Sequence, residues 1–99
     1  MPSDRHEAFR QASGFEWDET KRRANIGKHG LDFADAVEVF DDTRHFTYMS
    51  PVASEEPRYV SVGAVRGVLI AVVSTVRGSK LRIISARAAR ENERDRYAR

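Results

Sequence analysis

The sequence predicts an α+β domain with two N-terminal helices, a four-stranded antiparallel β-sheet and a C-terminal helix. Three observations support this fold class. Residues 19–40 show helical capping and spacing, residues 59–85 contain valine-rich runs separated by glycine turns, and residues 86–97 are charged and helix-prone. At 99 residues, the chain is long enough for one modest core and too short for two.

The first half of the chain contains two helix signals. Asp18 is a suitable N-cap for a helix over residues 19–29, and Gly30 supplies a left-handed stop. Asp32 caps a second helix over residues 33–40, where apolar side chains recur at helical spacing. We expect the aromatic residues of this half to be core residues: Phe15, Trp17, Phe33 and Phe40.

Strand patterns dominate the second half. Strands are expected at residues 44–50, 59–65, 68–76 and 80–85, with an exposed acidic loop at 50–57. Residues 68–73 are apolar on both faces, which predicts the central strand. Residues 86–97 contain few large apolar side chains, so we expect a charged helix on the surface of the sheet, with Arg87 at its start.

The domain itself is expected to span residues 15–99, because residues 1–14 lack a clean apolar pattern. We interpret them as a tail with a short helical piece around residues 4–12. The longest apolar run, residues 68–73, is far below the roughly 20 residues that span a bilayer. No signal peptide is recognisable, and the chain has no cysteine. These features predict a cytoplasmic protein without a membrane partner.

Charge is distributed unevenly along the chain. Residues 1–57 hold 7 basic and 12 acidic side chains, a net −5, whereas residues 58–99 hold 10 and 3, a net +7. All but one of the basic residues in the second part are arginines, which suit bidentate phosphate contacts. The second part is therefore the candidate polyanion-binding half, unless its arginines only form a solvated surface.

Several separated motifs resemble one known family. They are Phe15-Glu16-Trp17-Asp18, Lys21, Asn25, Lys28-His29-Gly30, Asp32-Phe33, Arg58-Tyr59, the segment from Arg82 to Arg87, and Glu93-Arg94 with Tyr97. In this order they are similar to the BrnT family, the ribonuclease toxins of type II toxin-antitoxin systems. The resemblance covers residues 15–97, and both the tail and the loop at 50–57 lie outside its pattern.

The resemblance implies a RelE-like fold and RNA cleavage without a metal or other cofactor. It also implies neutralisation by a small antitoxin, BrnA, in a hetero-oligomer. Since that antitoxin binds operator DNA, the resemblance implies that this chain contacts DNA only through its partner.

Metal-independent RNA cleavage needs a base for the 2′-OH, donors for the phosphorane charge and an acid for the leaving oxygen. Arg77, Arg82 and Arg87 are candidate catalytic donors, and His29 with Lys28 is a candidate acid or base with a further cation. The three arginines are alternatively ion-pair partners of acidic residues. Lys28-His29-Gly30 is alternatively an ordinary helix C-terminus.

Four further residues are candidates for substrate binding: Thr75, Lys80, Glu93 and Tyr97. Glu93 and Tyr97 are four residues apart on one helical face, which also fits simple helix packing. The three histidines lack metal-ligand spacing, so no metal site is expected. The competing functional class is a module without catalysis that binds RNA or an acidic protein through the same arginines.

Overall fold

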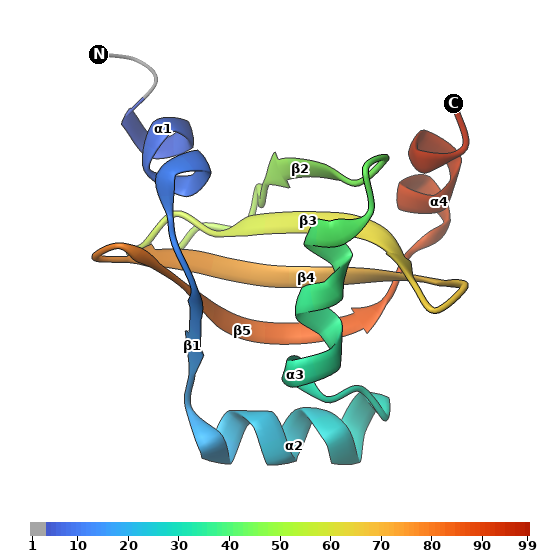
Figure 1. Cartoon of the computed structure of the whole chain (residues 1–99), viewed down its shortest axis with the longest axis horizontal. Coiled ribbons are helices and arrows are strands. Elements are labelled where there is room, and N and C mark those ends of the chain that lie inside the picture. Colours follow the sequence, from blue (N-terminus) through green and yellow to red (C-terminus); the bar gives the residue numbers. More distant parts are fainter. Residues whose placement is uncertain (1–3) are drawn as a thin grey trace.

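The fold is a five-stranded sheet with helices on one face and at its margins (Figure 1). A computed structural model describes residues 4–99, with side chains from residue 7 onward. The strands, in the spatial order β1-β5-β4-β3-β2, are β1 (Phe15–Trp17), β2 (Phe46–Met49), β3 (Tyr59–Val65), β4 (Val68–Arg77) and β5 (Lys80–Ala88). The helices are α1 (Asp4–Gln11), α2 (Glu19–His29), α3 (Phe33–Ala36), the 3-10 helix η1 (Val37–Asp41) and α4 (Glu91–Tyr97).

The predicted α+β class is confirmed, with one more strand than expected. Helix α2 and strand β3 have the predicted bounds, and the apolar strand β4 is central. The additional strand is β1, which pairs with β5 in parallel, so the sheet is not purely antiparallel. Three residues are too few to show a strand pattern in sequence, and β1 exists because the Leu81 N–H donates to the Gly14 carbonyl and Phe15 aligns with Leu81.

Several predicted boundaries were wrong, among them those of the strand expected at residues 44–50, which spans only Phe46–Met49. The expected helix over residues 33–40 is one turn of α-helix, α3, followed by the 3-10 helix η1. The last strand was expected to end at residue 85, but β5 continues to Ala88, so α4 begins only at Glu91. Ladder pairs Ala71–Arg87 and Ile70–Ala88 explain this, because pairing with β4 overrides the helix propensity of an alanine-rich segment. Arg87 is therefore a strand residue and not the start of a helix.

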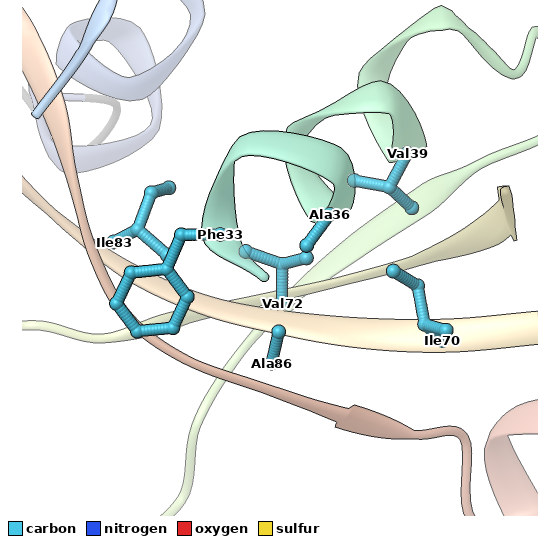
Figure 2. Packing of buried hydrophobic residues seen from close by; sticks show 7 residues of the cluster. All are labelled: Phe33, Ala36, Val39, Ile70, Val72, Ile83 and Ala86. Atoms are coloured by element: carbon cyan, nitrogen blue, oxygen red, sulfur yellow. The ribbon is translucent and has the colours of Figure 1, made fainter. Parts of the chain in front are cut away.

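One face of the sheet packs against α3 and η1. Figure 2 shows the seven residues of this core: Phe33, Ala36, Val39, Ile70, Val72, Ile83 and Ala86. On the opposite face, a smaller cluster forms from Val60, Val62, Ala71 and Ala89, with partly buried Phe46, Tyr48, Leu69 and Val73 against it. Among the helices of residues 4–99, none covers most of the width of this second face (Figure 1). Val60, Val62 and Ala71 are nevertheless buried in this cluster, whereas Val73 of β4 and Ile84 and Ser85 of β5 are half-buried.

A β-bulge in β5 decides which side chains reach the second face. Val73 pairs with Ser85 but Ser74 pairs with Ile83, which leaves Ile84 as an extra residue. Ile83 and Ala86 consequently share the core face, although their odd spacing would separate them in a regular strand. By the same shift, Arg82 and Arg87 both lie on the opposite face.

The segment before residue 15 contacts the sheet region. Helix α1 carries Phe9, whose ring centroid lies 4.7 Å from that of Tyr59 and 6.2 Å from that of Phe40. The Ser13 N–H donates to the Ser79 carbonyl over 2.6 Å. The division of the chain at residue 15 stays a prediction. Over the described residues, we find no helix with the length and apolar character needed to cross a membrane.

Gly63 in β3 should be intolerant of any side chain. An added Cβ would lie 2.7 Å from Val39 Cγ2 and 2.9 Å from His45 Cβ, so η1 or the residues before β2 would have to move. We expect Gly63→Ala to lower the free energy of unfolding by about 1–3 kcal/mol. Urea denaturation followed by circular dichroism measures this loss.

Gly27→Ala is the matched control for this substitution. Gly27 lies inside α2, and an added Cβ there meets no atom within 4 Å. Alanine has the higher helix propensity, so this variant should gain about 0.5–1 kcal/mol. An unaltered stability in Gly63→Ala would contradict close packing of η1 against β3.

Candidate functional site

An open hollow of about 470 Å³ lies on the second face of the sheet. Its floor is one row of cross-strand neighbours, in which Tyr48 pairs with Val60, Val60 with Val73, and Val73 with Ser85. The bulge residue Ile84 lines the same hollow. Four strands thus contribute to one concave surface.

Basic side chains from four parts of the chain surround this floor. They are Lys28 and His29 at the end of α2, Arg58 just before β3, Arg87 in β5, and Arg90 just before α4. Residues 50–54, from the loop after β2, form a further wall. The sequence-predicted Lys28, His29 and Arg87 therefore line one hollow, although 58 positions separate the last two in sequence.

Asn25 fixes the end of α2 beside β5. It is buried, and its Nδ2 donates to the carbonyls of Leu31 and Ala86 over 2.9 Å each, while its Oδ1 accepts from the Ala86 N–H over 3.1 Å. Strand β1 pairs with β5 only as far as Ile83, so Ala86 has no backbone partner from β1. The side-chain amide of Asn25 takes the place of that partner. Gly30 then ends α2 at φ 70°. Together these contacts hold Lys28 and His29 at the hollow.

Arg87 is held by a buried carboxylate. Its Nη1 and Nη2 donate to Glu93 Oε1 and Oε2 over 2.8 and 2.9 Å, a bidentate pair. The Arg87 side chain is 16% exposed and that of Glu93 1%. Glu93 also accepts from the Arg90 N–H over 2.8 Å and from the Tyr48 hydroxyl. The sequence-predicted Glu93 thus lies behind Arg87 with its oxygens occupied.

The ionisation of Glu93 follows from these contacts. Burial raises the pKa of its carboxyl, but the hydrogen bonds from Arg87, the Arg90 N–H and Tyr48 outweigh burial and lower the pKa to about 2. The same pair raises the pKa of Arg87, while burial and the hydrogen bond to Glu93 raise the pKa of Tyr48. Glu93 is therefore a carboxylate at neutral pH and holds no proton to exchange.

Arg77 and Arg82 form ion pairs outside the hollow. Arg77 Nε donates to Glu56 Oε2 and Arg82 Nη1 to Glu16 Oε2, each over 3.0 Å. The hydrogen bond to Glu56 raises the pKa of Arg77 and is the main reason that the pKa of Glu56 is lowered. With the Arg87–Glu93 pair, all three candidate arginines have carboxylate partners, which was the alternative interpretation of their pattern.

The remaining substrate-binding candidates lie apart from the hollow. Thr75 is buried, and its hydroxyl donates to the Pro57 carbonyl over 2.7 Å. The Tyr97 hydroxyl donates to Asp42 over 2.6 Å, and this bond helps to lower the pKa of Asp42 to about 2. Lys80 is exposed at the β4–β5 turn.

Two basic residues of the hollow were not predicted as site residues. Arg58 stands two positions before Val60, so strand alternation alone places it on the same face as that floor residue. Arg90 follows two alanines at a strand-to-helix junction, and its sequence carries no comparable signal. Within residues 7–99, Lys28, Arg58 and Arg90 form no ion pair, unlike Arg87. They are the cations of the hollow whose charge is not neutralised by a contact.

A metal site is not suggested by the arrangement of ligand-type side chains. In the described part of the chain, no three His, Cys, Asp or Glu residues form a group suited to hold a metal ion. The chemistry of the hollow is that of guanidinium, ammonium and imidazole groups above an apolar floor.

Replacing Glu93 should destabilise the fold and change its acid response. Glu93→Gln is expected to cost about 3–5 kcal/mol at neutral pH, because the enclosed Arg87 loses its counter-charge. The pKa of Glu93 is about 2 in the folded chain and 4.5 for an ordinary glutamate. The stabilisation by its charge is therefore complete above about pH 4.5 and is lost as the pH falls from about 4.5 to about 2. Urea unfolding at several pH values should show the gap between wild type and variant narrowing in acid.

Glu38→Gln serves as the control for charge removal. Glu38 pairs with Arg66 over 2.8 Å, but the two side chains are 39% and 65% exposed. Loss of such an exposed pair should change stability by less than about 1 kcal/mol. Equal losses in both variants would contradict a special role for the enclosed pair.

Comparison with known proteins agrees with the geometry. No curated protein matches the chain. The family model for the ribonuclease toxin BrnT of type II toxin-antitoxin systems matches residues 17–93, a span that includes α2, all of β2 to β5 and the Arg87–Glu93 pair. The chain therefore belongs to the BrnT family of ribonuclease toxins of type II toxin-antitoxin systems.

Proposed function

We propose that the chain is a metal-independent endoribonuclease whose active site is the hollow between α2 and the sheet. The observation that carries the proposal is that His29 lines the same hollow as three cations without an ion pair within residues 7–99: Lys28, Arg58 and Arg90. An imidazole can move a proton at neutral pH, and permanent cations stabilise a phosphorane. These are the chemical requirements of attack by the RNA 2′-OH on the adjacent phosphate.

Each basic residue has a distinct proposed role. His29 takes the proton from the 2′-OH or returns one to the leaving 5′-oxygen. Lys28, Arg58 and Arg90 bind the phosphate oxygens directly, because no carboxylate of residues 7–99 pairs with them. Arg87 presents its remaining Nε donor from a position that Glu93 fixes.

The other predicted cations receive a supporting role in this proposal. Arg77, Arg82 and Lys80 extend the positive surface beyond the hollow, toward the β4–β5 turn. A phosphate that approaches Arg77 or Arg82 has to compete with Glu56 or Glu16. Thr75 supports this area indirectly by holding the Pro57 carbonyl. We therefore expect these residues to affect RNA affinity more than the chemical step.

A cognate antitoxin follows from membership in a type II family. We propose that it is a BrnA-like protein, that it covers the basic hollow in a hetero-oligomer, and that it supplies the only contact with operator DNA. RNA cleavage in the cytoplasm by the uncovered chain would then inhibit translation. Asp35 and Glu38 of the first half are unsuited to compete for this antitoxin, because they already pair with Arg66 away from the hollow.

Cleavage of a structureless RNA in EDTA tests the enzymatic proposal. Wild-type chain should cleave it, and His29→Ala should lower the rate constant about 10²–10⁴-fold because proton transfer is lost. A 2′-deoxy nucleotide at the cleaved position should block the reaction, since the nucleophile is missing. Denaturing gel electrophoresis of end-labelled RNA measures both effects.

Arg66→Ala is the matched control, because Arg66 is an exposed cation that pairs with Asp35 and Glu38 away from the hollow. Its rate constant should equal that of wild type. Equal cleavage by wild type and His29→Ala would refute the assignment of the site. RNA that stays intact but is still bound would favour the alternative, a binding module without catalysis.

Hydrogen exchange of the chain with and without its antitoxin tests the partner proposal. Protection should appear at Arg58 and along β5 near Arg87, and the complex should fail to bind RNA, because both ligands need the same cations. Protection confined to α3 and η1 would contradict the proposal.

A further inference from the structure

An apolar strip crosses the centre of the basic hollow. Tyr48, Val60, Val73 and Ser85 are successive partners from β2 to β5, so their side chains form one continuous row. Ile84 lies beside this row because the bulge adds it to β5. Val60 is buried in the smaller cluster, but Tyr48, Val73, Ile84 and Ser85 are half-buried and leave apolar surface at the hollow, which phosphate binding by itself does not require.

Charged groups surround the strip without interrupting it. Arg58 stands two residues before Val60, and Arg87 two residues after Ser85, so the two guanidinium groups flank the row on opposite sides. Lys28 and His29 stand at the β5 end of the row. At the β2 end the wall is formed by the uncharged residues 50–54 and includes Val52, whose surface is 72% exposed.

We propose that the strip binds one unpaired nucleobase while the flanking cations hold the phosphates of the same nucleotide. The inference rests on the proposed function and names its substrate class, a single-stranded RNA with one base out of the stack. A base presents flat apolar faces and lies between two anionic phosphates of the RNA backbone. The hollow has the matching arrangement, with an apolar strip between Arg58 and Arg87. The volume of about 470 Å³ falls in the range of small-ligand sites.

The same geometry excludes a double-stranded substrate. Both faces of a base in a duplex are stacked and its edge is paired, so it reaches a concave floor only by leaving the helix. The floor offers side-chain hydroxyls only from Tyr48 and Ser85, and the Tyr48 hydroxyl already donates to Glu93. The site therefore selects for an unstacked base more strongly than for one base over another.

Titration with adenosine 3′-monophosphate tests this inference on the full chain. Separate titrations with adenosine and with inorganic phosphate measure the affinity of the apolar strip for the base and the affinity of the cations for the phosphate. The nucleotide should bind at least about tenfold more tightly than either part, and the amide signals of Val60, Val73 and Ile84 should shift in its NMR titration. Nucleotide affinity no greater than that of inorganic phosphate, or shifts confined to the basic residues, would overturn the inference.

Val73→Thr places a hydroxyl in the floor at similar size. It should weaken nucleotide binding about fivefold and leave the affinity for inorganic phosphate unchanged. Val76→Thr is the matched control, because Val76 is half-buried on the same strand and faces the other side of the sheet. Equal affinities in the two variants would count against the site. If Val73→Thr fails to fold, the chemical-shift changes of Val60, Val73 and Ile84 in the wild-type titration decide whether the strip binds the base.

The outcomes separate this inference from the ribonuclease proposal. Cleavage of RNA in EDTA without nucleotide binding at the strip refutes the base site and leaves the enzyme assignment intact. Nucleotide binding with shifts at Val73, but no cleavage, supports the base site and refutes the enzyme assignment.

Discussion

The extra residue at Ile84 is the constraint on which the site depends. Five positions separate Arg82 from Arg87, so a regular strand would direct them to opposite faces. The bulge brings both to the accessible face and still lets Ile83 and Ala86 enter the core against α3. Asn25 supports the strand just beyond the bulge, because its amide bonds both backbone groups of Ala86 where β1 no longer pairs. One local irregularity therefore serves the core, the end of α2 and the basic face together.

Contacts with carboxylates divide the arginines of this face into two groups. The arginines most conspicuous in sequence, Arg77, Arg82 and Arg87, are each paired with an acid that lies 6 to 66 positions away in sequence. Arg58 and Arg90 carry unpaired charge beside the apolar floor. A repeated arginine in a strand thus indicated the basic face of the sheet, but it did not indicate which cations of that face lack a carboxylate contact. The buried Glu93 is best understood as the group that orients Arg87.

The sequence alone predicted those helices and strands whose signal lies within the element itself. The capped helix α2, the valine-rich β3 and the two-sided apolar β4 followed from periodicity and turn residues. The sequence also predicted Lys28, His29 and Arg87 as candidate catalytic residues, and the structure places all three at one hollow. Non-local contacts were out of reach: the pairing of Phe15 with Leu81, the bulge at Ile84, and the partners of Glu16 and Glu93 all depend on the register between distant strands. The side chain of Asn25 gave no sign that it would act as a strand partner.

The ion pairs on the basic face also determine how binding of a polyanion responds to salt. A cation that already contacts a carboxylate neutralises little phosphate charge and therefore displaces few of the counterions condensed on the RNA. Only Lys28, Arg58 and Arg90 enter the hollow without such a partner in the described residues. For single-stranded RNA, with about 0.7 counterions released per neutralised phosphate, three such contacts correspond to a salt exponent of about −2. The face is rich in arginine, yet under the proposed function most of its attraction for RNA would come from Lys28, Arg58 and Arg90.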